Sequence, residues 1–218
     1  MPHHSVKRVF YFTSAKWALD DVAKRRIKIA RIDELNDPFE LWCVSQPHRE
    51  LRDTLRSYKK EMNEKFGLVC FSDDWVNPLM WSHYAEKHRG ICLGFDVDTR
   101  VLHQVRYVSD RPSLEVPPTL ETAQGLLWTK FRDWSYEREW RAWLQLDERE
   151  NGLYFYRFET QPDFMRLREV IVGPICDFGE AQVRHALNGH PGDVKLIKAR
   201  LAFNSFQVVI KQNGFQPC

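Results

Sequence analysis

Two glutamates in the segment YEREWRAW, residues 136–143, are the side chains best placed to do chemistry. The segment alternates apolar and polar residues and predicts a half-buried strand. Glu137 and Glu139 would then face the same side, because side chains two apart share a face. Two such carboxylates repel each other unless a cation, water or a substrate lies between them. The pair could bind a sugar hydroxyl and stabilise positive charge on a sugar carbon. The alternative is an ordinary surface ion-pair network with Arg132, Arg138 or Arg141.

A second group of chemically capable residues lies in MWSHYAEKHRGICLGFDVD, residues 80–98, which begins like an amphipathic helix and ends like a strand. His83 and His88 are five positions apart, a spacing that does not bring two metal ligands to one helix face, so no metal site is predicted. Tyr84 either faces a ligand or packs in the core, and an aromatic residue on a helix is more often buried.

The motif LNDPFE, residues 35–40, predicts a turn, because Asn-Asp-Pro disfavours both helix and central strand. In the simplest interpretation Asn36 or Asp37 accepts hydrogen bonds from backbone amides of the turn. The turn also brings Asp37 and Glu40 to the expected end of a sheet, where binding sites tend to gather.

These residues must be positioned by a mixed set of helices and strands. The order of elements is not a regular β-α alternation, which favours an α+β fold over a doubly wound sheet. We expect one domain over residues 1–218. Ser14 and Asn77 are expected to cap helices, and Pro78 to open one. Helices are expected over 17–28, 49–65, 120–131 and 180–187, and strands at RVFYFTS, RIKIARID, GLVCFS, GICLGFDV, QVRYVS, EWRAWLQL, GLYFYRF, LREVIVG, VKLIKARL and FQVVI.

Composition excludes several classes of protein. A formal net charge of +2 does not indicate a nucleic-acid coat or a membrane surface. No apolar run of about 18 residues predicts a membrane span, and the N-terminal residues lack the apolar region of a signal peptide. Five cysteines without a C-x-x-C pair indicate free thiols in a reducing cytoplasm. The sequence contains no G-x-G-x-x-G, P-loop or G-x-S-x-G motif.

Three blocks together resemble a widespread bacterial family known as a domain of unknown function. They are NDPFE, MWSHYA with HRGICLGF, and YEREWR. Some members of that family are encoded beside phage-defence (abortive-infection) genes. The resemblance implies a toxin or defence effector, with an antitoxin or another defence protein as a possible partner.

The order FYFTS, then GLVCFS with WSHYA and GICLGFDV, then YEREW is similar to the ADP-ribosyltransferase fold. The resemblance implies a largely antiparallel, split β-sheet flanked by helices, with NAD+ as substrate. By position, Tyr84 would stack on the nicotinamide ring, Glu139 would be the catalytic carboxylate and Glu137 would orient the acceptor. Tyr11 stands where that fold often has His or Arg, so the group that orients NAD+ is not identified.

The same resemblance implies the remaining binding residues. The expected NAD+ contacts are Tyr11, Thr13, Ser14, Ser72, Trp81, His83 and Tyr84. The expected substrate contacts are Asn36, Asp37, Glu40, Arg132 and Trp134.

The expected activity is therefore transfer of ADP-ribose from NAD+ to a protein or nucleic acid, or hydrolysis of NAD+. Two alternatives remain open. One is a metal-dependent nuclease built on Asp37, Glu40, Glu137 and Glu139. The other is a nucleotide-binding interaction module without catalysis.

Overall fold

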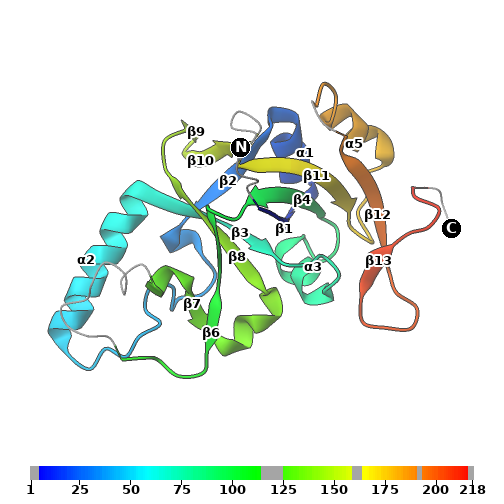
Figure 1. Ribbon diagram of the computed structural model, residues 1–218. Coiled ribbons are helices and arrows are strands. Elements are labelled where there is room, and N and C mark those ends of the chain that lie inside the picture. The colour runs from blue at the N-terminus through cyan, green and yellow to red at the C-terminus, as the bar shows by residue number, and fades with distance from the viewer. Residues whose placement is uncertain (1–4, 114–124, 159–163, 191–192, 216–218) are drawn as a thin grey trace. The chain divides into compact units, whose positions relative to one another are not determined.

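The computed structural model describes residues 5–113, 125–158, 164–190 and 193–215 (Figure 1). The fold is mixed α/β, and most strand pairs are antiparallel. Contacts divide the chain into two compact units. Unit 1 consists of residues 1–27, 71–101 and 157–218, and unit 2 consists of residues 28–70 and 102–156.

The sheet of unit 1 has the strand order β13-β12-β11-β4-β1-β3 (Figure 1). Neighbouring strands are antiparallel except β11 and β12, which are parallel. The strands are β1 (Val6–Thr13), β3 (Phe66–Ser72, of which residues 71–72 belong to this unit), β4 (Ile91–Asp98), β11 (Met165–Val172), β12 (Lys195–Leu201) and β13 (Val208–Ile210).

Strand β4 is the centre of this sheet. It pairs with β1 from Val6↔Asp98 to Thr13↔Ile91, and β11 lies on its other side. Every apolar side chain of β4 is fully buried, as expected for a continuous apolar run between two strands.

The described residues of unit 1 contain the helices α1 (Ala15–Lys24), α3 (Pro78–Tyr84) and α5 (Glu180–Ala186). The Ser14 hydroxyl accepts a hydrogen bond from the Trp17 amide and caps α1. The Asn77 side chain accepts from the Leu79 amide and caps α3, with Pro78 in the first turn. Both caps were predicted from the sequence.

The sheet of unit 2 is built on β3. In one direction β2 (Arg26–Arg31), β10 (Leu153–Arg157) and β9 (Arg149–Glu150) follow. The strand β3 also pairs with β8 (Glu139–Gln145), which in turn pairs with β5 (Leu102–Gln104). The described residues of this unit also contain a separate pair of short parallel strands, β6 (Arg106–Val108) and β7 (Thr129–Phe131). They further contain the 3-10 turns η1 (Ile32–Glu34), η2 (Leu126–Trp128) and η3 (Arg132–Glu137).

Helix α2 (Arg49–Lys65) has the bounds predicted from its apolar spacing. Leu51 and Leu55 are buried in the core of unit 2, and Tyr58 and Met62 pack against it. This core also contains residues of η1, of the loop after it and of η2: Ile32, Leu41, Cys43, Val44, Leu126 and Leu127.

Two predicted helices differ from the structure. The first ends at Lys24 instead of Lys28, because Arg25 adopts a left-handed conformation with φ of 52° and Arg26 starts β2. Of the helix predicted over 120–131, Gly125 is helical, but the prediction is wrong beyond it, since Leu126–Trp128 form a 3-10 turn and Thr129–Phe131 form β7. Residues 120–124 lie outside the described part of the chain. None of the helices among the described residues combines the length and apolar character that a membrane crossing requires.

Candidate functional site

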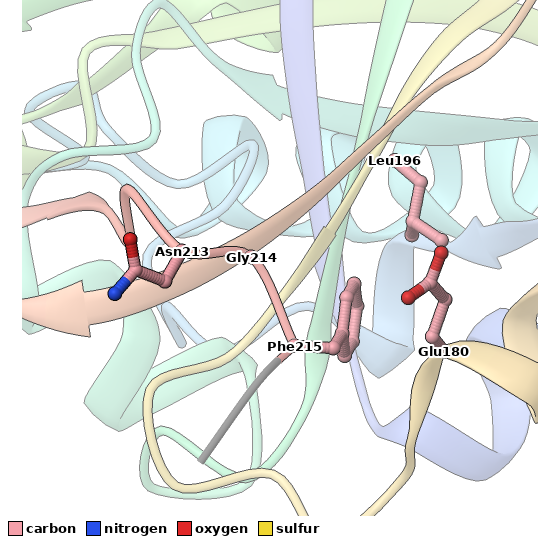
Figure 2. Close-up of a pocket in the computed structure, with 5 residues that line it drawn as sticks. All are labelled: Glu180, Leu196, Asn213, Gly214 and Phe215. Carbon is pink, nitrogen blue, oxygen red and sulfur yellow. The ribbon is translucent and has the colours of Figure 1, made fainter. Parts of the chain in front are cut away.

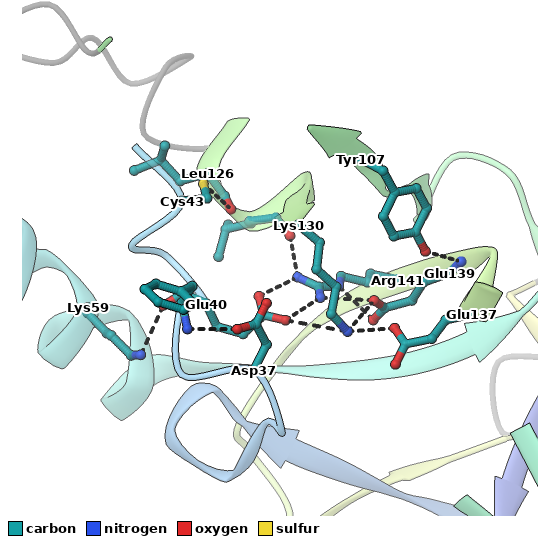
Figure 3. Close-up of polar contacts among 12 residues, drawn as sticks. Asp37, Glu40, Cys43, Lys59, Tyr107, Leu126, Lys130, Glu137, Glu139 and Arg141 are labelled. Atoms are coloured by element: carbon teal, nitrogen blue, oxygen red, sulfur yellow. Dashed lines mark hydrogen bonds and ion pairs between the residues drawn. The ribbon is translucent and has the colours of Figure 1, made fainter. Parts of the chain in front are cut away.

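Glu137 and Glu139 converge on one lysine in unit 2. The Lys130 Nζ lies 2.6 Å from Glu137 Oε2 and 3.2 Å from Glu139 Oε2 (Figure 3). Glu137 is the last residue of η3 and Glu139 the first of β8, so the two do not share a strand. Arg138 between them adopts a left-handed conformation with φ of 47°, and this turn of the chain aims both carboxylates at Lys130.

Arg141 holds a third carboxylate in the same cluster. Its Nε donates to Glu139 Oε1 at 2.7 Å, and its Nη1 and Nη2 donate to the two oxygens of Glu40 at 2.9 and 2.6 Å (Figure 3). The Arg141 Nη1 also donates to the carbonyl oxygen of Leu127 at 2.7 Å. We call Glu40, Lys130, Glu137, Glu139 and Arg141 the charged cluster. Each of its members is at most 6% exposed.

Mutual pairing keeps Glu139 and Lys130 of the charged cluster ionised. Burial alone would raise the pKa of Glu139, but Arg141 and Lys130 outweigh that effect and lower the pKa to about 2. Burial opposes the charge of Lys130, yet the nearby carboxylates raise its pKa above the ordinary value.

Tyr107 fixes the backbone beside the charged cluster. The Glu139 amide donates to the Tyr107 hydroxyl oxygen at 2.8 Å (Figure 3). Burial raises the Tyr107 pKa to about 12, so this hydroxyl stays neutral. The thiol of Cys70 interacts with the Glu139 carboxylate, and burial raises the pKa of that thiol well above the ordinary value, which favours its neutral form.

The NDPFE turn contributes Glu40 to the charged cluster, and a hydrogen bond to the Asp37 side chain stabilises the turn. The buried Asp37 side chain accepts a hydrogen bond from the Phe39 amide at 2.9 Å, as in the simplest interpretation of the turn. Lys59 Nζ, on α2, donates to the Glu40 carbonyl at 2.9 Å and ties the turn to that helix. Asn36 is exposed.

Arg132 and Trp134, two expected substrate contacts, lie in η3. Arg132 is exposed, and Trp134 is half-buried with its ring centroid 4.8 Å from Lys130 Nζ. A lysine ammonium at this distance from an indole face is attracted to the ring. Trp134 therefore contacts the charged cluster through Lys130.

The expected NAD+ contacts all lie in unit 1, whereas Glu137 and Glu139 lie in unit 2. Tyr11 and Thr13 are on β1, and Ser14 uses its hydroxyl to cap α1. Ser72 is buried and pairs opposite Phe10.

The expected NAD+ contacts on helix α3 differ in their exposure to solvent. Trp81 is fully buried: its Nε1 donates to the Trp75 carbonyl at 2.6 Å and its ring meets Phe12 edge-on. His83 is exposed, and its ring lies 6.1 Å from that of the half-buried Tyr84.

The sequence identified three members of the charged cluster but missed how two others act. Arg141 appeared only as one partner in a surface network, although its spacing of two from Glu139 on a strand places both on one face. Lys130 was assigned to an expected helix. The nuclease alternative grouped Glu40 with Glu137 and Glu139, but no local pattern predicted that Arg141 would hold Glu40 there.

Lys130 takes the position that a metal ion would need in the nuclease alternative. Its Nζ lies within 4 Å of all three carboxylates, with the longest distance, to Glu40 Oε1, being 3.9 Å. A divalent ion could use these oxygens together only after the ammonium had left. Among the residues that the structure describes, no group of three or more His, Cys, Asp or Glu side chains is arranged to hold a metal.

Pockets occur in both units. In unit 1, Glu180, Leu196, Asn213, Gly214 and Phe215 line a cavity of about 390 Å³ that includes no expected site residue (Figure 2). In unit 2, a smaller cavity of about 240 Å³ is lined by Phe39, Cys43, Val108, Ser109, Asp110, Arg111 and Phe131. We call it the Phe39 pocket.

Comparison with known proteins gives one match. No curated protein and no solved structure matches the chain. Residues 80–142 match a family model described as a protein of unknown function, DUF2971. The matched segment runs from helix α3 to one residue beyond Arg141 and includes every member of the charged cluster except Glu40. Over this segment the chain is similar to DUF2971, a family whose description assigns no activity.

Proposed function

We propose that the protein consumes NAD+, transferring its ADP-ribose to a macromolecule or to water, and that the charged cluster supplies the catalytic carboxylate. The observation that carries the proposal is the convergence of Glu137 and Glu139 on a single positive centre, the Lys130 ammonium. A site that stabilises one positive charge by fixed, ionised carboxylates can stabilise another that develops in its place.

The chemistry requires such a site. When the nicotinamide–ribose bond breaks, its electron pair leaves with nicotinamide and positive charge develops on the ribose carbon. Glu139, whose pKa Arg141 lowers and whose ion pair with Arg141 remains after Lys130 has withdrawn, would stabilise that charge. Glu137 would then accept the proton of the attacking hydroxyl or water, which forms the new bond to the ribose carbon.

Lys130 must withdraw before a substrate can take its place. Its side chain is a flexible four-carbon stem, and the Trp134 ring already lies 4.8 Å from its ammonium. In this proposal Trp134 receives the displaced ammonium, while Arg141 stays in place and keeps Glu139 aligned. The nicotinamide contact expected of Tyr84 stays a prediction.

A second candidate is a nucleotide-binding module without catalysis. The pairing within the charged cluster favours this second candidate. Lys130 and Arg141 pair with all three carboxylates, and such a network can serve to hold unit 2 in one conformation without taking part in catalysis. Such a module predicts binding of nucleotides without turnover.

Release of nicotinamide from NAD+ distinguishes the two candidates. The purified chain would be incubated with NAD+, with and without cell lysate, beside Glu139→Gln and Tyr84→Ala. If the unsubstituted chain releases nicotinamide and Glu139→Gln does not, the result supports the enzymatic function. If release also depends on lysate, the ADP-ribose is transferred to a macromolecular acceptor. Binding of NAD+ without release supports the module.

Growth on expression tests the proposed setting in phage defence. A toxin or defence effector that consumes NAD+ should arrest growth, and Glu139→Gln should restore it. Rescue by a co-expressed neighbouring gene product would identify the partner protein that restrains it. Equal growth arrest by both chains would contradict an NAD+-based toxicity.

A further inference from the structure

The strands β6 and β7 separate two different surfaces of unit 2. Tyr107 pairs with Lys130, and Val108 pairs with Phe131. Consecutive residues of a strand project to opposite faces. Lys130 belongs to the charged cluster and Tyr107 contacts it, whereas Val108 and Phe131 both line the Phe39 pocket. The pocket is therefore on the face of this strand pair that does not carry the charged cluster.

The Phe39 pocket combines apolar walls with a charged rim. Phe39 and Phe131, which are 47% and 44% exposed, present phenyl surface to it. Cys43 contributes a neutral thiol, because burial raises its pKa to about 11. Partly exposed phenylalanines at a cavity lined mainly by apolar side chains are typical of a ligand site.

Arg111 gives the pocket a binding group for an anion. Its guanidinium carbon lies 4.6 Å from the centre of the Phe39 ring. A guanidinium over an aromatic ring still has N–H donors that can meet a phosphate. The neighbouring Asp110 carboxylate can accept a hydrogen bond from a ligand amino group. The loop is tied down just beyond Arg111, where the Ser45 amide donates to the Pro112 carbonyl at 2.9 Å.

The volume limits the part of a ligand that enters the pocket to one small ring system. Pockets for drug-sized molecules have volumes of roughly 300 to 1,000 Å³, and the Phe39 pocket has about 240 Å³. It can take a nucleobase but not a whole dinucleotide such as NAD+.

We propose that the Phe39 pocket binds a free mononucleotide, with the base against Phe39 and Phe131 and the phosphate at Arg111. This site is additional to the carboxylates of the proposed activity and stands whether or not the protein consumes NAD+. The base of this mononucleotide carries an amino group, since the Asp110 carboxylate can accept a hydrogen bond from that group.

Titration of the full chain with AMP tests this site. Phe39→Ala and Arg111→Ala should each weaken AMP binding by about tenfold or more, since stacking on an aromatic ring and pairing with phosphate each contribute at that level. Arg111→Lys keeps the charge and should recover part of the affinity. Phe203→Ala and Arg49→Ala are matched controls, because both side chains are highly exposed and lie outside the pocket. They should bind AMP like the unsubstituted chain.

Three outcomes would overturn the proposal. In the first, the folded chain does not bind AMP. In the second, the two pocket variants bind AMP as tightly as the controls do. In the third, the chain binds a 5′-phosphorylated single-stranded oligonucleotide more tightly than it binds AMP. The last would show that the source of the base and phosphate is a nucleic acid and not a free nucleotide. Nicotinamide release is measured in a separate assay. The Glu139→Gln chain should bind AMP whether or not it releases nicotinamide, so the absence of the proposed activity would not affect the test of the Phe39 pocket.

Discussion

Arg141 and Glu40 are 101 positions apart in the chain and form a two-pronged ion pair, with Nη1–Oε2 and Nη2–Oε1 distances of 2.9 and 2.6 Å. The same guanidinium also holds Glu139. One buried arginine therefore connects the NDPFE turn to the strand that carries the proposed catalytic carboxylate.

Removal of this arginine should destabilise the protein strongly. Arg141→Ala leaves the Glu40 and Glu139 carboxylates buried without their main cation, and breaking a buried pair in this way costs about 3 to 5 kcal/mol. Chemical denaturation measures the free energy of unfolding. Arg49→Ala on α2, whose side chain is 88% exposed, is the matched control and should change it by less than about 0.5 kcal/mol. A similar small change for Arg141→Ala would contradict the structure of the charged cluster.

Lys130 and Glu137 should be energetically coupled. Lys130→Met alone leaves Glu137 and Glu139 facing each other without the ammonium, which is unfavourable for both. Adding Glu137→Gln removes one of the two charges, so the double variant should be more stable than the sum of the two single effects predicts. A double-mutant cycle of unfolding free energies should give a coupling of at least about 1 kcal/mol. Additivity within about 0.3 kcal/mol would show that this ion pair is not formed.

Acid should weaken the fold through Glu139. Its pKa in the folded chain is about 2 and its ordinary value is 4.5, so the unfolded chain takes up the proton more readily. The stabilisation, roughly 3 kcal/mol, is present above pH 4.5 and is lost as the pH falls towards 2. The slope of stability against pH in this window should become shallower in Glu139→Gln and stay unchanged in Glu64→Gln, which alters an exposed glutamate of α2. Equal slopes in all three chains would argue against an ionised, paired Glu139.

Asp21 in unit 1 should have the opposite pH dependence. Burial raises its pKa to about 7, and its Oδ1 makes no hydrogen bond within the described part of the chain. Because the pKa of Asp21 is raised, the contribution of its neutral carboxyl to the stability of the fold is complete below pH 3.8. This contribution is lost as the pH rises through 7. Asp21→Asn should therefore raise the stability at pH 8 and have little effect at pH 4. The exposed Asp177 offers the control Asp177→Asn, and an Asp21→Asn chain that is less stable at pH 8 would contradict this account.

Local patterns predicted the elements that depend on local interactions. The apolar spacing of Leu51, Leu55, Tyr58 and Met62 gave the bounds of α2, and Ser14 and Asn77 were predicted as caps because their side chains bond the next turn. The helix expected through Phe131 was wrong because pairing of β7 with β6, about 23 residues earlier in the chain, overrides the local helical pattern.

The charged cluster could be predicted only in part for the same reason. The spacing of Glu137 and Glu139 indicated two carboxylates that act together, and the need for a cation between them followed from electrostatics. The sequence could not identify Lys130 as that cation or bring Glu40 to Arg141, because both depend on contacts between segments that are distant in the chain. The left-handed backbone of Arg138, which turns Glu137 towards Lys130, also has no sequence signal, since arginine seldom adopts it.

The most direct test of the proposed activity is the rate of nicotinamide release from NAD+ by four folded chains: unsubstituted, Glu139→Gln, Glu139→Asp and Glu64→Gln. If Glu139 stabilises the positive charge on ribose, release should fall by at least about 100-fold in Glu139→Gln, less in Glu139→Asp, and not at all in Glu64→Gln. Release by Glu139→Gln at the unsubstituted rate would contradict the role of the charged cluster, and absence of release from every chain would contradict the proposed activity itself.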